Sequence, residues 1–151
     1  MNTDLTYHTI EGIPESFVLN QLMDVYTQLF EDAKPDFFLL RVHSKKDLVV
    51  NLCYHDSLLI GFKMGYQYNE TTFYSWVGGV LPEHRKKGIA QQLMELQHKT
   101  AKELSYQKIR AKSMNRFKPM MILNLKNGFD IVQVYTNDSQ QTKVIFEKEL
   151  S

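Results

Sequence analysis

A strand, a short basic turn and a long amphipathic helix follow one another directly in this chain, and this arrangement limits the possible folds most. Residues 72–80 are rich in β-branched and aromatic side chains, which is typical of a strand. From Ile89 onwards, apolar residues recur with the period of a helix. The turn at residues 81–88 must therefore connect the strand directly to the helix.

The turn is basic at a position where positive charge is unfavourable. Arg85, Lys86 and Lys87 stand at the start of the predicted helix. Because a helix N-terminus is already positive, each cation there costs about 0.3–1 kcal/mol unless an anion compensates. The free N–H groups of a first helical turn bind such anions, and Gly88, which has no Cβ, lets an anion approach the backbone. The turn is therefore predicted to bind phosphate.

The other elements alternate between strand and helix patterns. We expect strands at residues 5–10, 48–54, 58–66, 72–80, 108–111, 129–136 and 143–148, and helices from residue 14 to a break at Pro35, at residues 37–42, from residue 89 to 104 and from residue 115 to 127. Short links predict that the second, third and fourth strands form an antiparallel meander. Asn115 is expected to cap the last helix, with Pro119 in its first turn and Asn127-Gly128 at its end.

The composition is that of a globular protein. The chain has 151 residues, of which 43% are hydrophobic and 23% charged, and its net charge of +1 does not favour nucleic acid or anionic membranes. We expect one α/β domain over residues 1–151, with about seven strands in a mixed sheet and about four helices. The single cysteine, Cys53, lies in an apolar run, which predicts a buried side chain and a reducing, cytoplasmic location. The histidines show no metal-ligand spacing, so no metal site is expected.

A family resemblance rests on residues 85–90, Arg-Lys-Lys-Gly-Ile-Ala, which fit the pattern Gln/Arg-x-x-Gly-x-Gly/Ala and follow Val80-Leu81-Pro82. Between a strand and a long helix, this pattern resembles the acetyl-CoA-binding motif of the GCN5-related N-acetyltransferases (GNATs). Residues 115–129 resemble a second signature of that family, and the order of elements agrees over nearly the whole chain. The resemblance implies a GNAT-like fold and acetyl-CoA as cosubstrate.

The resemblance also implies where acetyl-CoA binds. The strand at residues 72–80 would carry a bulge, expected at Gly78-Gly79, and separate from the strand at residues 108–111, so that the pantetheine arm enters the gap. Backbone groups of Gly79 and Val80 would pair with the pantetheine amides. The expected cofactor-binding residues are Gly79, Val80, Arg85, Lys86, Lys87, Gly88, Ile89, Ala90, Gln91 and Asn115. A solvated side chain remains the alternative for Lys86 or Lys87, and a helix cap remains the alternative for Asn115.

The implied reaction is direct attack of an amine on the thioester through a tetrahedral intermediate. An alkylammonium of pKa near 10 must first lose a proton to a base, and the backbone N–H of Val80 is implied as the donor to the oxyanion. The family position that often carries a tyrosine as general acid holds Asn124, whose amide can hydrogen-bond to sulfur but cannot release a proton. Helix surface or a cap is the alternative for Asn124. Tyr74, Tyr106 and Tyr135 are other candidates for the acid, without a positional reason.

The general base and the acceptor pocket are left open. The strand at residues 72–77 has no carboxylate or histidine, so the candidates for the base are Glu31, Asp32, Glu70, Glu83 and His84. Glu31 and Asp32 follow the first helix, which usually walls the acceptor pocket in the family; a solvated helix end is the alternative. By the period of two, Thr72, Tyr74, Trp76 and Gly78 share one face. Tyr74 and Trp76 could bind a cationic amine through cation–π contact, or they could pack in the core.

The predicted function is transfer of acetyl from acetyl-CoA to a primary amine on a small molecule, a peptide N-terminus or a lysine. A non-catalytic acyl-CoA sensor or interaction module on the same fold is the alternative, favoured by the missing tyrosine and base. Three adjacent cations are too few for a nucleic-acid footprint, so neither nucleic acid nor membrane is expected as a partner. A monomer or a homodimer is expected, with an edge strand at residues 143–148 as a possible pairing surface.

Overall fold

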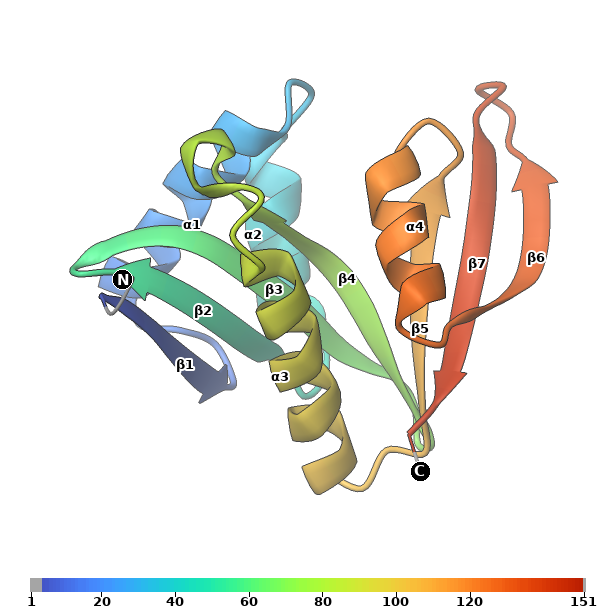
Figure 1. Ribbon diagram of the computed structural model, residues 1–151, viewed down its shortest axis with the longest axis horizontal. Coiled ribbons are helices and arrows are strands. Elements are labelled where there is room, and N and C mark those ends of the chain that lie inside the picture. Colours follow the sequence, from blue (N-terminus) through green and yellow to red (C-terminus); the bar gives the residue numbers. More distant parts are fainter. Residues whose placement is uncertain (1–3, 151) are drawn as a thin grey trace.

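The computed structural model describes residues 4–150, which form a seven-stranded mixed sheet with helices on its faces (Figure 1). The strands are β1 (Leu5–Glu11), β2 (Val49–His55), β3 (Leu58–Asn69), β4 (Thr72–Val80), β5 (Lys108–Met114), β6 (Asp130–Thr136) and β7 (Thr142–Glu149). The helices are α1 (Ser16–Leu29), α2 (Pro35–Ser44), α3 (Ile89–Glu103) and α4 (Lys118–Lys126), and a single 3₁₀ turn, η1 (Pro82–His84), lies between β4 and α3. The predicted fold class is confirmed.

The strand order in the sheet is β1-β2-β3-β4-β5-β7-β6. Tight turns join β2, β3 and β4 into the predicted antiparallel meander, whereas α3 crosses over between β4 and β5 and makes that pair parallel. The expected edge strand at residues 143–148 is wrong. The last hairpin places β7 between β5 and β6, so that β1 and β6 are the edges of the sheet.

The helices cover both faces of the sheet, with α1 and α2 on one face and α3 and α4 on the other (Figure 1). Leu22 of α1 and Phe38 of α2 pack into one apolar cluster, and Met94 and Ala101 of α3 pack into another. Cys53 lies in the first cluster and is fully buried, as predicted; burial raises the pKa of its thiol. None of the helices within residues 4–150 is both long and apolar enough to cross a membrane.

Three helices begin at different residues from those predicted. α1 begins at Ser16, two residues after the predicted start. α2 begins at Pro35, which sits in the first helical turn, where a missing N–H costs nothing. α4 begins at Lys118, so Asn115 is not its cap, and the prediction of a cap there is wrong. The backbone N–H of Asn115 instead donates to the carbonyl of Thr142 at 2.9 Å, which keeps residue 115 in the loop after β5. The end of α4 is as predicted, with Gly128 in the left-handed region at φ +88°.

A bulge interrupts β4 at Trp76. Met64 of β3 pairs with Val77, whereas the next residue, Gly65, pairs with Ser75, so Trp76 is the extra residue. The predicted bulge at Gly78-Gly79 is therefore wrong by two residues, because regular pairing of β4 with β3 resumes at Val77. The sequence shows which residues suit a bulge, here the two glycines, but the pairing register of the strands determines which residue is unpaired.

The bulge also reverses the alternation of side chains in the rest of β4. Gly78 was expected on the same face as Tyr74 and Trp76. Instead, a Cβ on Gly78 would lie 3.1 Å from Cγ of Lys63, on the α3 face, whereas a Cβ on Gly79 would meet Leu29 of α1 at 2.6 Å. The extra residue thus turns Gly78 away from the aromatic side chains that precede it.

Beyond the bulge, β4 and β5 separate. Their parallel pairing covers Thr72 to Ser75 on β4 and ends with the pair Ser75–Ala111. Each strand then continues without the other, β4 as far as Val80 and β5 as far as Met114. Figure 1 shows the two strands close together at the lower end of the sheet and apart at the upper end. The predicted gap between these strands is confirmed, and it leaves the inner edge of β4 open.

Candidate active site

The turn before α3 exposes a row of backbone N–H groups. Gly88 is the N-cap of α3 and has a φ of +80°. Lys86 also has a positive φ, of 63°, which is uncommon for a residue other than glycine. The first backbone hydrogen bond of α3 runs from the N–H of Gln92 to the carbonyl of Gly88 at 3.0 Å. In the described chain, the N–H groups of residues 86–91 donate to no other residue. No atom lies within 4 Å of the position that a Cβ of Gly88 would take, so a ligand can reach these N–H groups.

Side chains around the turn hold it in place. Ile89 is buried and anchors the start of α3 in the core, whereas Lys86, Lys87 and Ala90 are exposed. Arg85 bends back, and its Nε donates to the carbonyl of Val80 at 3.0 Å, which ties the turn to the end of β4. The exposed lysines are free to contact an anion, and Arg85 has a structural partner.

Gln91 links the start of α3 to the end of α4. Its Nε2 donates to Oδ1 of Asn127 at 2.6 Å, and Nδ2 of Asn127 donates to Oε1 of Gln91 at 2.8 Å. Nε2 of Gln91 also lies 2.7 Å from a carboxylate oxygen of Glu95. The amide side chain of Gln91 is therefore engaged within the protein, and only its backbone N–H is directed at the open turn.

The inner edge of β4 presents backbone groups of alternate residues to the gap. Leu81 donates its N–H to the carbonyl of Ile60 at 2.8 Å, which makes this a hydrogen-bonded pair of the antiparallel ladder. Backbone hydrogen-bonding groups point alternately to the two sides of a strand. The N–H and C=O groups of Gly79 therefore point toward β3, and those of Gly78 and Val80 point toward the gap. Gly78 was not among the predicted binding residues, because its orientation depends on the register.

Lys63 lies on the α3 face beside the same edge. It pairs with Gly78 across β3 and β4, and the missing side chain of Gly78 leaves room for the lysine stem. Lys63 is only 7% exposed, and no carboxylate of residues 4–150 lies within ion-pair distance of it. Burial lowers the pKa of Lys63 to about 8. The sequence held one signal for this residue, a lysine in the middle of an apolar strand.

The two predicted asparagines differ in their surroundings. Asn124 is 2% exposed, so the interpretation as helix surface is wrong. The carbonyl of Asn124 accepts the backbone N–H groups of Asn127 and Phe129, both at 3.1 Å, which closes the end of α4. Asn115 is exposed in the loop between β5 and α4, and its carbonyl accepts a hydrogen bond from the ammonium of Lys118.

A hollow of about 570 Å³ opens on the α2 face, where β4 and β5 begin to separate. Its walls include Arg41, Lys45, Tyr66, Tyr74, Arg110 and Lys112, and Tyr135 of β6 closes one side. Tyr74 was predicted to contact the acceptor. Burial, reinforced by the neighbouring Tyr66, raises the pKa of Tyr74 to about 12. Its phenol is therefore neutral at pH 7 and can donate a hydrogen bond.

Trp76, the other aromatic residue predicted to contact the acceptor, packs against the first apolar cluster and does not line the hollow. Its ring centroid is 5.4 Å from that of Phe38, and the guanidinium of Arg41 lies 5.1 Å from the centre of the indole. The structure does not bring the candidate bases to the hollow. The exposed residues Glu31, Asp32, Glu70 and Glu83 and the half-buried His84 all lie outside the walls of the hollow. Tyr106 donates its hydroxyl to Gln67 at 3.2 Å, away from the gap.

One group of potential metal ligands lies elsewhere in the described residues. Asp4, His55 and Asp56 bring their ligand atoms within 4.8 Å of one another at the end of the β1–β2 pair. The group is largely exposed, and acidic side chains commonly approach one another there without an ion. A second hollow, of about 710 Å³, lies near Gly12 and the C-terminal end of α3; its walls include Glu70 and Tyr106, two of the acid–base candidates, but none of the predicted cofactor-binding residues.

Comparison with known proteins agrees with this geometry. A sequence model of the acetyltransferase (GNAT) family matches residues 16–129, and the chain belongs to this family. No curated protein matches the chain at a significant level of sequence similarity. The family assignment confirms the resemblance that the turn before α3 had suggested.

Several solved structures share the fold. Ard1 from Thermoplasma volcanium superposes with a TM-score of 0.81 at 15% identity, covering 97% of this chain and 98% of that one. A GNAT family acetyltransferase from Elizabethkingia anophelis, with acetyl-CoA bound, gives a TM-score of 0.74 at 18% identity, covering 97% and 99%. Arabidopsis thaliana NAA60 in complex with acetyl-CoA gives 0.73 at 18% identity, covering 95% and 98%. At these identities the likeness establishes the fold alone.

Proposed function

We propose that this protein is an acetyl-CoA-dependent N-acetyltransferase that transfers acetyl to a primary amine by direct attack. One observation carries the proposal: the open edge of β4 leads into a row of free N–H groups at the start of α3. An extended molecule with amides along its length and a diphosphate at one end is complementary to both features. Membership of the GNAT family, and acetyl-CoA in two structures of the same fold, support this choice of cosubstrate.

The cofactor would bind along the inner edge of β4. The N–H groups of residues 86–91 would hold the pyrophosphate, with Lys86 and Lys87 near its charge. The pantetheine amides would pair with the backbones of Gly78 and Val80 in the manner of an added strand. In this arrangement Gly78 takes the part that had been assigned to Gly79, because the backbone of Gly79 is directed toward β3.

The acceptor amine would approach from the hollow on the α2 face. A bond forms between the amine nitrogen and the acetyl carbon, and the backbone N–H of Val80 donates to the oxyanion of the tetrahedral intermediate. The carbon–sulfur bond then breaks, and the side-chain amide of Asn124 steadies the departing thiolate by a hydrogen bond. Since no carboxylate or histidine lines the hollow within the described residues, the proton of the amine leaves through water.

Binding of acetyl-CoA to a pair of matched glycine variants tests the cofactor site. Gly88 and Gly12 both have a left-handed φ, of +80° and +101°, and neither would bring a Cβ within 4 Å of another residue. Gly88→Val and Gly12→Val should therefore carry similar backbone strain, of about 1–2 kcal/mol. Calorimetry should show about tenfold or greater loss of acetyl-CoA affinity for Gly88→Val alone. Equal affinities in the two variants, or no binding to folded wild-type protein, would contradict the proposal.

A non-catalytic acyl-CoA sensor is the second candidate, and Asn124 in place of a proton donor favours it. The two functions differ in whether CoA is released. A thiol-release assay with acetyl-CoA and a panel of amines distinguishes them, because the sensor binds acetyl-CoA without releasing CoA to any amine. Amine-dependent release at a rate above the buffer control supports the enzyme.

A further inference from the structure

The hollow on the α2 face is lined by cations and by no acidic residue. Arg41 lies on α2 and Lys45 directly follows that helix, whereas Arg110 and Lys112 come from β5, on the opposite side. Asp and Glu are missing from its walls within the described chain. The remaining walls are mainly tyrosine and glutamine side chains, which donate or accept hydrogen bonds without adding charge.

Two of the four tyrosines that line the hollow already have one of the protein's own cations over the ring. The ammonium of Lys45 lies 5.3 Å from the ring centre of Tyr66, and the guanidinium of Arg110 lies 4.9 Å from that of Tyr68. Arg41 covers Trp76 in the same way at 5.1 Å. A cationic acceptor would therefore be repelled by these cations, and the indole of Trp76, which the sequence had suggested as a cation–π contact, already faces Arg41.

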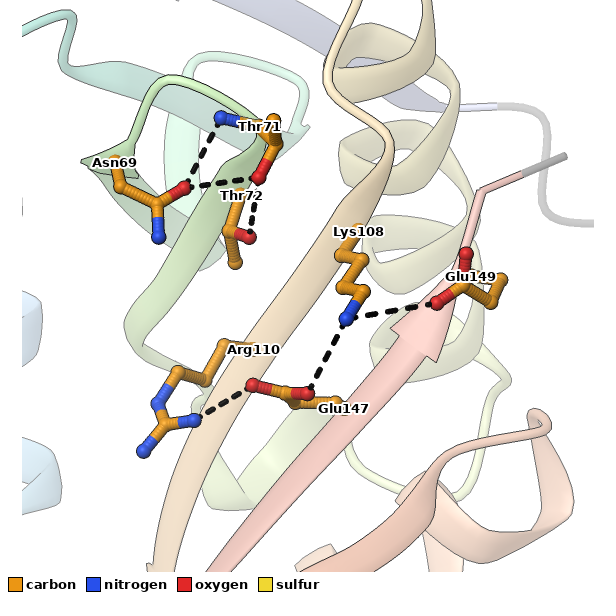
Figure 2. Close-up of polar contacts among 7 residues, drawn as sticks. All are labelled: Asn69, Thr71, Thr72, Lys108, Arg110, Glu147 and Glu149. Carbon is orange, nitrogen blue, oxygen red and sulfur yellow. Dashed lines mark hydrogen bonds and ion pairs between the residues drawn. The ribbon is translucent and has the colours of Figure 1, made fainter.

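Internal ion pairs neutralise little of this charge. Glu147 lies 2.6 Å from Arg110, and Lys108, which does not line the hollow, lies 3.9 Å from both Glu147 and Glu149; Figure 2 shows these contacts. Arg41, Lys45 and Lys112 have no carboxylate within 4.0 Å among residues 4–150. Arg41, Lys45 and Lys112 thus face the same hollow without a counter-charge. The electrostatic potential in the hollow is therefore positive and favours binding of an anion.

The geometry points to an acceptor that is a small amine with an anionic group, a carboxylate or a phosphate, seated among Arg41, Lys45 and Lys112. The inference rests on the proposed function and adds the class of acceptor. A volume of about 570 Å³ suits a small molecule. Its amine would lie toward the separation of β4 and β5, and the anion would stay unchanged while the nitrogen–carbon bond forms and the carbon–sulfur bond breaks.

Matched acceptors test the charge preference on the full chain, with acetyl-CoA present in excess. The pairs are L-phenylalanine and its amide, γ-aminobutyrate and its amide, and aminoethyl phosphate and ethanolamine; putrescine serves as a cationic acceptor. The first two pairs report a carboxylate, and the third reports a phosphate. We expect the charged member of at least one pair to have a kcat/KM about tenfold higher, the scale of one charge-assisted hydrogen bond. Equal use of both members, or a preference for putrescine, would overturn the inference.

Charge-removing variants identify the residues responsible. Lys112→Gln and Lys45→Gln should raise KM about fivefold or more for the charged acceptor, with kcat and the neutral acceptor little changed. Lys99→Gln, an exposed lysine on α3 outside the hollow, is the control and should change neither. A uniform effect on charged and neutral acceptors would overturn the assignment.

Failure of the proposed function can be told apart from failure of this inference. If no amine releases CoA, calorimetry of the same acceptor pairs with acetyl-CoA-saturated protein still measures the charge preference directly. Tighter binding of the anionic member, lost in Lys112→Gln and kept in Lys99→Gln, would support an anion site without catalysis. No difference in binding between the members would refute it.

Discussion

Replacing the buried Lys63 with methionine should make the protein more stable at neutral pH. Lys63 is 7% exposed on β3 and has no acidic partner within residues 4–150, so the folded protein must bury its charge or keep the amine neutral. Methionine has a similar length and no charge, and it adapts well to an irregular core. Lys63→Met therefore removes the electrostatic cost and leaves most of the packing intact.

The magnitude follows from the lowered pKa. Burial moves the pKa of Lys63 from 10.5 to about 8. A difference of about 2.5, at about 1.36 kcal/mol for each pKa unit, corresponds to about 3 kcal/mol. Below pH 8 the lysine is protonated in both states, so the folded protein carries the full cost. Between pH 8 and 10.5 the folded state loses the proton and the unfolded state keeps it, so wild-type stability rises with pH.

Urea unfolding of both proteins at pH 7, 8, 9 and 10 measures this difference. We expect Lys63→Met to exceed wild type by up to about 3 kcal/mol at pH 7, and the advantage to shrink as the pH approaches 10.5. Lys99→Met, at an exposed position on α3, is the control and should stay within about 0.5 kcal/mol of wild type. A less stable Lys63→Met at pH 7, or an advantage that does not depend on pH, would refute the reasoning.

Two further predictions concern the sheet and α3. Gly65→Ala should lower the free energy of unfolding by about 2 kcal/mol or more, because the added Cβ would lie 2.4 Å from the carbonyl of Tyr74, which belongs to the backbone and cannot rotate away. Gly61→Ala on the same strand, where the added Cβ would lie 3.4 Å from its nearest neighbours, is the comparison in urea unfolding. Burial, together with the nearby Lys148 and Lys63, lowers the pKa of His98 to about 3, so stability should be lost as the pH falls from 6.5 toward 3. His98→Phe should lessen that loss in unfolding measured at pH 7, 5 and 4, and an unchanged pH profile would contradict the assignment.

The sequence predicted those features that depend on neighbouring residues. The meander, the helix after Gly88 and the end of α4 at Gly128 follow from local patterns, and the structure has each of them. Where local chemistry allowed several outcomes, the prediction failed. Asn115 has a suitable side chain for a helix cap, yet its backbone is held by Thr142 on β7, and α4 begins later.

Only the tertiary structure decided which groups face the open site. The sequence by itself determined that a glycine turn with free N–H groups precedes α3, because capping and helix periodicity are local properties. It did not determine that the bulge falls at Trp76, that Gly78 turns toward the gap, or that Lys63 is buried beside it. The cationic hollow likewise joins α2 to β5, far apart in the chain. Strand register and the packing of distant elements set these features, and neither is encoded within a single segment.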